Sequence, residues 1–190
     1  MTAEAFTCST AAIQRLTRFR RMASQLTGDQ GCHDDEPSKT LGIVGFGAFR
    51  RLIARYLYPH FDLVVSDPAL CPDAPLPGGV RVGDNGAAGA CDLVILAVPI
   101  DALAAALDGI HPHLRPGSTV VDVVSVKVEW VRIMRAMLPD HVEIVGAHPL
   151  FGPQSAHGGI AGRKIALCRV HGGAVLWNAA FLRRVLGLKV

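Results

Sequence analysis

The sequence predicts an α/β fold in which a mostly parallel sheet is covered by helices on both faces. From residue 40 onward, short runs of Val, Ile and Leu alternate with segments of helical spacing, as in βαβ units. The strand-like runs are apolar throughout, which is typical of parallel strands buried on both faces. Half of the 190 residues are hydrophobic, which is enough for one sizeable core.

The expected elements follow one another with few interruptions. Strands are expected at residues 40–46, 62–67, 91–99, 118–125, 142–148 and 163–170, and helices at residues 48–59, 101–110, 126–138 and 174–187. Apolar residues in the helical segments recur every three or four positions. A stretch rich in Pro and Gly, residues 68–86, separates the second and third strands, and residues 187–190 resemble the first step of another strand.

The first 39 residues differ from the rest and predict an N-terminal extension with a linker. Residues 11–26 place apolar side chains among arginines, which favours a short basic amphipathic helix, and residues 28–39 have the composition of a solvated linker. Residues 40–190 are expected to form one domain. The extension is either a loosely ordered segment or, because it is rich in Arg, an organelle transit peptide. We therefore expect a cytoplasmic protein, or a protein of a plastid or another organelle if the extension is a transit peptide.

Composition excludes several classes of function. The net charge is +3 and no dense basic block occurs, which argues against a nucleic-acid partner. The longest apolar run, residues 93–100, is too short to span a bilayer, so no membrane partner is expected. The five cysteines are scattered without metal-binding spacing, and His111 and His113 flank a proline in an expected loop. We therefore expect no disulfide framework and no metal site.

A glycine-rich turn joins the first strand to the first helix. In GFGAFR, residues 45–50, the first glycine permits a tight turn and the second lets the backbone approach a pyrophosphate at the helix N-terminus. Asp67 ends the second strand about 20 residues later, where an acid accepts hydrogen bonds from ribose hydroxyls and repels a 2′-phosphate; alternatively, it is a turn residue before Pro68. The pattern predicts a Rossmann-like, doubly wound domain that binds NAD, with NADP less favoured. The expected cofactor contacts are Gly45, Phe46, Gly47, Ala48, Phe49 and Asp67.

Arg50 departs from this fingerprint. It stands where a third glycine normally lets the helix pack close to the strand. Its side chain must turn aside toward the phosphates, or it must hold the helix away from the sheet. The departure favours an alternative in which the chain is a non-catalytic nucleotide-binding module, or a degenerate fragment that needs a partner domain.

A histidine ends the strand-like run of GAHPLFGPQSA, residues 146–156. Ligands of open α/β sheets bind at the carboxyl ends of the strands, and a neutral imidazole can accept a proton near pH 7. His148 is therefore either a satisfied structural histidine or a base that meets a substrate. Ser125 ends the preceding strand, where it could contact a ligand or cap the helix at residues 126–138.

Four segments together resemble the prephenate/arogenate dehydrogenase family of tyrosine biosynthesis. They are GIVGFG (42–47), CDLVILAVP (91–99), VDVVSVK (121–127) and GAHPLFGPQSA (146–156), in the family's order. The resemblance covers roughly residues 40–190. It implies NAD(P)-dependent oxidative decarboxylation of prephenate or arogenate, with hydride transfer to the nicotinamide and a histidine that accepts the 4-hydroxyl proton.

The resemblance also implies roles for individual residues. His148 matches the catalytic histidine, and Ser125 matches the serine of an SxK motif that contacts the histidine, the substrate or the nicotinamide ribose. Val98 and Pro99 match a stretch that lines the cofactor pocket. Lys127 either meets a substrate carboxylate or lies in water. Gln154 and Ser155 are expected to offer polar contacts to the substrate.

Members of that family continue into a helical domain that forms a dimer and closes the active-site cleft. We therefore expect the dinucleotide-binding domain to be incomplete at its C-terminal end and the helical dimerisation domain to be absent. A homodimer or a separate helical partner is left open, and low activity is expected for the chain alone. Another β-hydroxyacid-type dehydrogenase would also fit the glycine turn, but it would need a lysine on a later helix.

Overall fold

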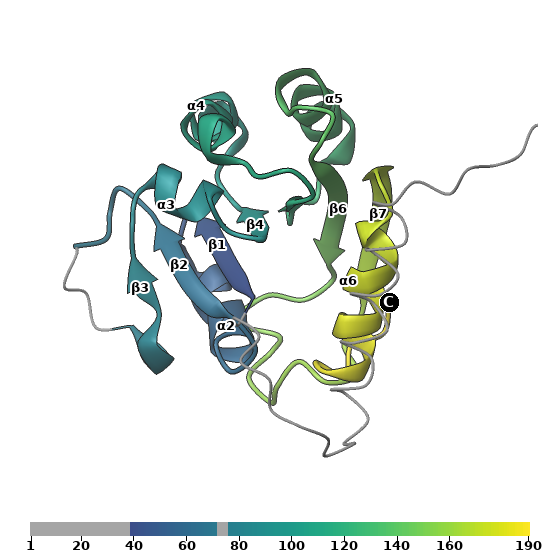
Figure 1. Ribbon diagram of the computed structural model, residues 1–190. Coiled ribbons are helices and arrows are strands. Elements are labelled where there is room, and N and C mark those ends of the chain that lie inside the picture. Colours follow the sequence, from purple (N-terminus) through teal and green to yellow (C-terminus); the bar gives the residue numbers. More distant parts are fainter. Residues whose placement is uncertain (1–38, 72–75) are drawn as a thin grey trace, which may run out of the picture. The chain divides into compact units, whose positions relative to one another are not determined.

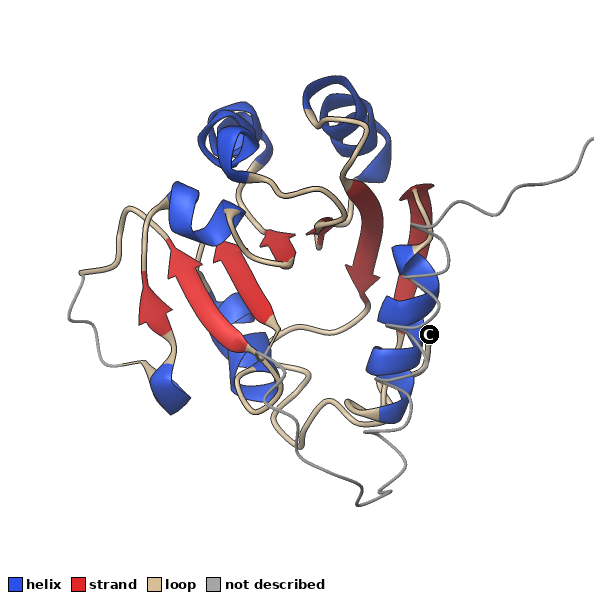
Figure 2. Cartoon of the chain, viewed as in Figure 1, coloured by secondary structure: helices blue, strands red, loops and turns tan. Residues whose placement is uncertain are grey.

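A seven-stranded sheet lies at the centre of the computed structural model, which describes residues 39–71 and 76–190 (Figures 1 and 2). Its strands are β1 Thr40–Val44, β2 Asp62–Ser66, β3 Arg81–Val82, β4 Leu93–Leu96, β5 Thr119–Asp122, β6 Glu143–Pro149 and β7 Ile165–His171. All belong to one unit, Pro37–Val190. Apart from Lys39, the extension and linker expected at residues 1–39 lie outside the described residues.

The strand order is β3-β2-β1-β4-β5-β6-β7. Strands β1 to β6 pair in parallel, whereas β7 runs antiparallel to β6 at the edge of the sheet. The chain moves from β1 outward to β3, then returns to the other side of β1 and continues outward from β4. This reversal is the topological switch point of a doubly wound sheet, and it confirms the predicted Rossmann-like fold class.

Helices cover both faces of the sheet (Figure 1). They are α2 Ala48–Leu57, α3 Asn85–Gly89, α4 Leu103–Ile110, α5 Lys127–Met137 and α6 Ala174–Arg184. Buried residues of α3, α4 and α5 pack in one core cluster, and those of α2 and α6 pack in the other. Leu41 and Ile43 enter the second cluster while Val44 enters the first. The central strand β1 therefore supplies side chains to both faces, as a buried parallel strand must.

Two short elements were not predicted. Strand β3 and helix α3 lie in or next to the stretch rich in Pro and Gly, and they span only two and five residues. The α3 sequence NGAAG has no apolar periodicity to reveal it. Its start depends on Asp84, whose carboxylate accepts a hydrogen bond from the Ala87 backbone N–H at 2.7 Å, an ordinary N-cap.

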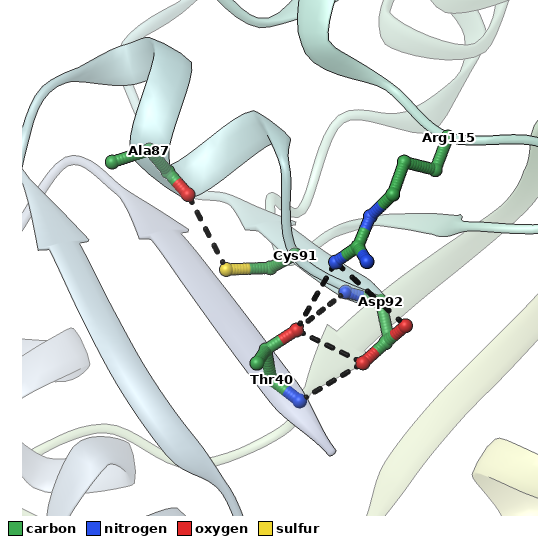
Figure 3. A network of polar contacts seen from close by, with 5 residues as sticks. All are labelled: Thr40, Ala87, Cys91, Asp92 and Arg115. Atoms are coloured by element: carbon green, nitrogen blue, oxygen red, sulfur yellow. Dashed lines mark hydrogen bonds and ion pairs between the residues drawn. The ribbon is translucent and has the colours of Figure 1, made fainter. Parts of the chain in front are cut away.

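A polar network fastens the amino ends of β1 and β4 (Figure 3). The Asp92 carboxylate accepts hydrogen bonds from the Thr40 backbone N–H at 3.0 Å and from its hydroxyl at 2.9 Å. Arg115 lies 3.9 Å from the same carboxylate. The Cys91 thiol donates to the Ala87 carbonyl, and burial raises the pKa of Cys91. This network lies at the amino edge of the sheet, so we assign it a structural role.

Glu143, at the start of β6, caps helix α6. Its buried carboxylate accepts a hydrogen bond from the Gly173 backbone N–H at 3.0 Å and another from Ala174. We expect Glu143→Ala to lower the free energy of unfolding by about 1–3 kcal/mol, because two partly buried N–H donors lose their charged acceptor. Denaturant unfolding measures this. Glu129→Ala removes an exposed carboxylate paired with Arg132 and is the matched control, so an equal effect of both variants would contradict the cap.

Candidate functional site

The carboxyl ends of four neighbouring strands lie in register. Val44 of β1 pairs with Leu96 of β4, Leu96 with Asp122 of β5, and Asp122 with Gly146 of β6. The glycine turn, residues 97–99, residues 123–127 and His148 follow these positions directly. The sheet therefore brings the predicted site residues from four separate segments to one edge, across the switch point where open α/β sheets bind ligands.

The glycine turn packs on the end of β4. Gly45 has a φ of 84°, and a Cβ added there would lie 2.9 Å from the Ala97 carbonyl oxygen and 3.1 Å from Cγ1 of Val98. A larger residue would be strained by both the backbone angle and the contact. Gly45 also donates its N–H to the Ser66 carbonyl at 2.7 Å. The predicted cofactor residues Gly45 and Val98 are thus neighbours, and Pro99 follows at the exposed rim.

Asp67 is attached to the glycine turn by its side chain. One carboxylate oxygen accepts the Phe46 backbone N–H at 2.5 Å, and the other accepts the Ala69 backbone N–H at 2.8 Å. The second bond closes the turn that contains Pro68, which agrees with the alternative that Asp67 is a turn residue. The first bond holds the carboxylate at the mouth of the glycine turn. A carboxylate has about four lone-pair sites, so both bonds leave acceptor capacity for ribose hydroxyls.

Arg50 folds back over the glycine turn. A Cβ added at Gly47 would lie 2.9 Å from an Arg50 guanidinium nitrogen. Burial lowers the pKa of Arg50, and the nearby charge of Asp67 opposes this effect. Helix α2 still begins normally, because Arg50 and Arg51 both donate their N–H to the Gly47 carbonyl at 3.1 Å. The arginine side chain has therefore turned aside, and its guanidinium lies over the backbone of Gly47.

Phe49 connects the first turn of α2 with the loop that follows β6. Its ring lies 6.0 Å from that of Phe151, in a tilted arrangement. Both rings also line an apolar hollow between α2 and α6, on the face of the sheet away from α5. Sequence reasoning did not single out Phe151. Its signal is an aromatic residue within three positions of His148.

His148 lies near the end of β6 and is half-buried. Its backbone pairs with Ala166 of β7. Side chains two residues apart on a strand project from the same face, so His148 projects from the face of Gly146 and Asp122. That face carries α3, α4 and α5.

Ser125 is exposed in the loop between β5 and α5, and its hydroxyl makes no hydrogen bond within the described part of the chain. Helix α5 begins at Lys127, with Val126 as its N-cap and no side-chain cap. The expectation that Ser125 caps this helix is therefore wrong, because the helix starts one residue too late for it. The hydroxyl is left available to a ligand.

Lys127 and Asp122 form an ion pair next to Gly146, two residues before His148 on β6. The Asp122 side chain is fully buried, and the Lys127 ammonium donates to one of its oxygens and to the Ala147 carbonyl. Burial raises the pKa of Asp122, while the hydrogen bond and charge of Lys127 lower it. The sequence signal for Asp122 is an acid within an apolar strand, which requires a partner when buried.

Gln154 and Ser155 lie on the exposed loop beyond β6. The Ser155 hydroxyl accepts the Gly152 backbone N–H at 3.0 Å and donates to the Gly152 carbonyl at 3.2 Å. These bonds close a local turn, as serine commonly does. Substrate contacts from this loop stay a prediction.

In residues 39–71 and 76–190, no group of three His, Cys, Asp or Glu side chains could hold a metal ion. No helix of the same residues is long and apolar enough to cross a bilayer.

Part of this chain is similar in sequence to known dehydrogenases. Residues 79–169 match the model of the prephenate dehydrogenase nucleotide-binding domain. A cyclohexadienyl dehydrogenase of Zymomonas mobilis is 27% identical over 135 residues, which cover 62% of this chain and 42% of the relative. Arogenate dehydrogenase 2, chloroplastic, of Arabidopsis thaliana is 31% identical over 121 residues, which cover 60% of this chain and 34% of the relative. Each match thus spans less than half of the relative's own length.

The fold is also found in solved structures. Synechocystis arogenate dehydrogenase superposes with a TM-score of 0.63 at 21% identity, over 79% of this chain and 58% of that chain. At this identity the likeness concerns the fold alone, whereas the family model and the sequence relatives concern descent. Residues 79–169 of this chain are thus similar to the nucleotide-binding domain of prephenate dehydrogenases, and the sequence relatives are arogenate, prephenate or cyclohexadienyl dehydrogenases.

Proposed function

We propose that the chain is the nucleotide-binding and histidine-carrying part of an NAD(P)-dependent dehydrogenase that oxidatively decarboxylates prephenate or arogenate in tyrosine biosynthesis. The observation that carries the proposal is the register of β1, β4, β5 and β6, which brings the glycine turn and His148 to one edge of the sheet. The match to the nucleotide-binding domain model and the similarity to a cyclohexadienyl dehydrogenase support a dinucleotide as cofactor and a small molecule as substrate.

The residues of this edge suit the proposed chemistry. The nicotinamide, when bound, supplies the hydride acceptor. His148 accepts the proton of the substrate's 4-hydroxyl as a general base. The exposed Ser125 hydroxyl orients the histidine, the substrate hydroxyl or the nicotinamide ribose. The turn formed by Gly45, Phe46 and Gly47 and the start of α2 at Ala48 and Phe49 hold the pyrophosphate, and Val98 and Pro99 flank them.

We propose NAD rather than NADP as the preferred cofactor, because Asp67 stays at the mouth of the glycine turn. A fixed carboxylate repels the 2′-phosphate of NADP. We expect Asp67→Asn to shift the ratio of the NADPH and NADH dissociation constants toward NADPH by roughly tenfold, about 1.4 kcal/mol. Fluorescence titration with both nucleotides measures this ratio.

The control for Asp67→Asn is Asp108→Asn, which removes an exposed acid from α4. It should leave both dissociation constants unchanged. If Asp67→Asn weakens both nucleotides equally, Asp67 only closes its turn, and the proposed preference for NAD is wrong.

The proposed function is tested by binding and turnover together. The purified chain is titrated with NADH and NADPH, and nucleotide reduction is then followed with prephenate and with arogenate. Turnover of either substrate supports the proposal and identifies the substrate. Failure to bind either nucleotide contradicts it.

The position of Arg50 favours a second candidate, a non-catalytic nucleotide-binding module or a degenerate fragment that needs a partner domain. Its guanidinium covers Gly47, the point where the backbone must approach a pyrophosphate. Nucleotide binding without turnover of either substrate supports this candidate over the enzyme.

An apolar rim around the site supports a further polypeptide partner. Four large side chains that follow β4, β5 and β6 are exposed: Ile100, Val126, Val128 and Leu150. Clustered exposed apolar residues of this kind mark interaction surfaces. We propose that a helical domain or a second copy of the chain covers this rim, in the cytoplasm or, as for the chloroplastic Arabidopsis relative, in a plastid.

A further inference from the structure

The ion pair below His148 joins three elements of the fold. Asp122 is the last residue of β5, Lys127 is the first residue of α5, and the Ala147 carbonyl belongs to β6. The Lys127 side chain is 22% exposed, whereas that of Asp122 is fully buried. Burying an ion pair costs more than its attraction recovers unless further hydrogen bonds satisfy the charges. The pair is therefore weak evidence for stability, and its placement requires another explanation.

The Lys127 ammonium holds the backbone directly before the histidine. The β5–β6 ladder ends at the pair Asp122 and Gly146. Beyond this point β6 continues to Pro149 with only β7 as a paired strand. Lys127 binds the Ala147 carbonyl in this unsupported stretch. Where β5 no longer pairs with β6, the Lys127 ammonium thus supplies a hydrogen bond to the β6 backbone. This bond fixes the part of β6 from which His148 projects.

Asp122 keeps one carboxylate oxygen free on the same side of the sheet. Oδ1 binds Lys127, but Oδ2 is buried and has no hydrogen-bond partner among the described residues. A Cβ added at Gly146 would lie 3.3 Å from Oδ2, so the oxygen lies against the strand two residues before His148. A buried, unpaired carboxylate oxygen carries a desolvation penalty. A positive charge on an imidazole of the same face of the sheet would offset part of that penalty.

Other ionisable groups lie on the strand and helix next to this point. From β7, a Cβ added at Gly146 would lie 3.3 Å from the Cys168 Cβ, and Cys168 is itself exposed. From α5, Glu129 and Arg132 pair with each other at the surface. Asp122 and Lys127 are the charged residues whose side chains lie against Gly146, two residues before His148 on the same face of β6. The charge of His148 also contributes to lowering the pKa of Asp122, which indicates that the two groups are coupled.

We propose that Lys127 and Asp122 are positioning residues for His148. Lys127 fixes the carbonyl that precedes the histidine, and Asp122 supplies the negative charge that stabilises the imidazolium formed when His148 takes the substrate proton. The second role rests on the proposed function. Two of the three N–H donors of Lys127 are already used, which disfavours the expectation that Lys127 grips a substrate carboxylate.

An NMR titration of the histidine side chains tests the proposal without any need for turnover. The His148 signal is identified by its absence in His148→Asn. Asp122→Asn keeps an acceptor for Lys127 but removes the charge, and it should lower the His148 midpoint by about half a pH unit or more. Lys127→Met should raise the midpoint, and Lys127→Arg, which keeps the charge, should restore it. The exposed His157 is the internal control.

The opposite directions of the two shifts are the decisive feature. If neither variant moves the His148 midpoint beyond that of His157, the pair is only structural and the proposal is wrong. Shifts in the same direction indicate general loosening and also contradict it. If Lys127→Met does not fold, Asp122→Asn still tests the charge of Asp122, because the Asn side chain keeps an acceptor for Lys127: an unchanged His148 midpoint in this variant contradicts the proposal.

Kinetics separate positioning from substrate contact. If Lys127 positions His148, Lys127→Met lowers kcat and leaves KM for the substrate near its original value, and Lys127→Arg restores kcat. If Lys127 instead binds a substrate carboxylate, Lys127→Met raises KM with kcat little changed, and this outcome overturns the proposal. A chain that shows the expected NMR shifts but turns over neither prephenate nor arogenate contradicts the proposed function and retains the positioning of His148.

Discussion

Replacing His148 by asparagine is expected to lower turnover by about 100- to 10,000-fold, the range for loss of a general base. Asparagine keeps a polar side chain of similar size at the end of β6, but it cannot take up a proton near neutral pH. The dissociation constant of NADH should stay unchanged, because the glycine turn and Asp67 belong to other segments of the same edge. Steady-state turnover and NADH fluorescence titration measure the two quantities.

His157→Asn is the matched control for this experiment. His157 lies on the exposed loop beyond β6, nine positions after His148, and its replacement should change neither turnover nor NADH binding. Equal turnover of the His148→Asn variant and the unaltered chain would show that the histidine is structural. A parallel loss of NADH binding would show that the substitution disturbs the nucleotide site rather than the chemistry.

The arrangement of the site was largely predictable because parallel strands align their carboxyl ends. Once the sequence indicates that residues 40–46, 91–99, 118–125 and 142–148 are parallel neighbours, their following residues must meet at one edge. The glycine turn, Val98, Ser125 and His148 needed no further information to be placed together. The antiparallel direction of β7 was not predicted, because an apolar run carries no signal of strand direction.

Contacts that depend on side-chain direction were less predictable. Ser125 stands before a helical pattern, and the sequence alone cannot distinguish a capping serine from one just outside the helix; the structure starts α5 at Lys127. The sequence offered two alternatives for Asp67, a turn residue or a ligand contact. Its carboxylate closes the turn through the Ala69 N–H and also binds the Phe46 N–H of the glycine turn. The link from Lys127 to the Ala147 carbonyl bridges positions far apart in the chain, and no local pattern reveals it.

The largest effect on stability is expected from Gly42→Ala, in the middle of β1. A Cβ at this position would lie 2.2 Å from the Ala88 carbonyl oxygen and 2.8 Å from the carbonyl carbon and Cα of the same residue. All three atoms are backbone atoms of α3, and Ala88 is fully buried, so no flexible side chain can move away. We expect a loss of about 3 kcal/mol or more, at the upper end of overpacking. Thermal unfolding should show a Tm lower by roughly 6–12 °C.

Gly158→Ala is the control for Gly42→Ala. No atom lies within 4 Å of a Cβ added at Gly158, so its Tm should stay within about 2 °C of the original value. The comparison also bears on the site, because β1 leads directly into the glycine turn at Gly45. If α3 must move away from β1 to admit a methyl group, the turn loses its fixed position, and NADH binding should weaken together with stability. An unchanged Tm for Gly42→Ala would mean that α3 does not rest on β1, and that the glycine in this strand serves no close backbone approach.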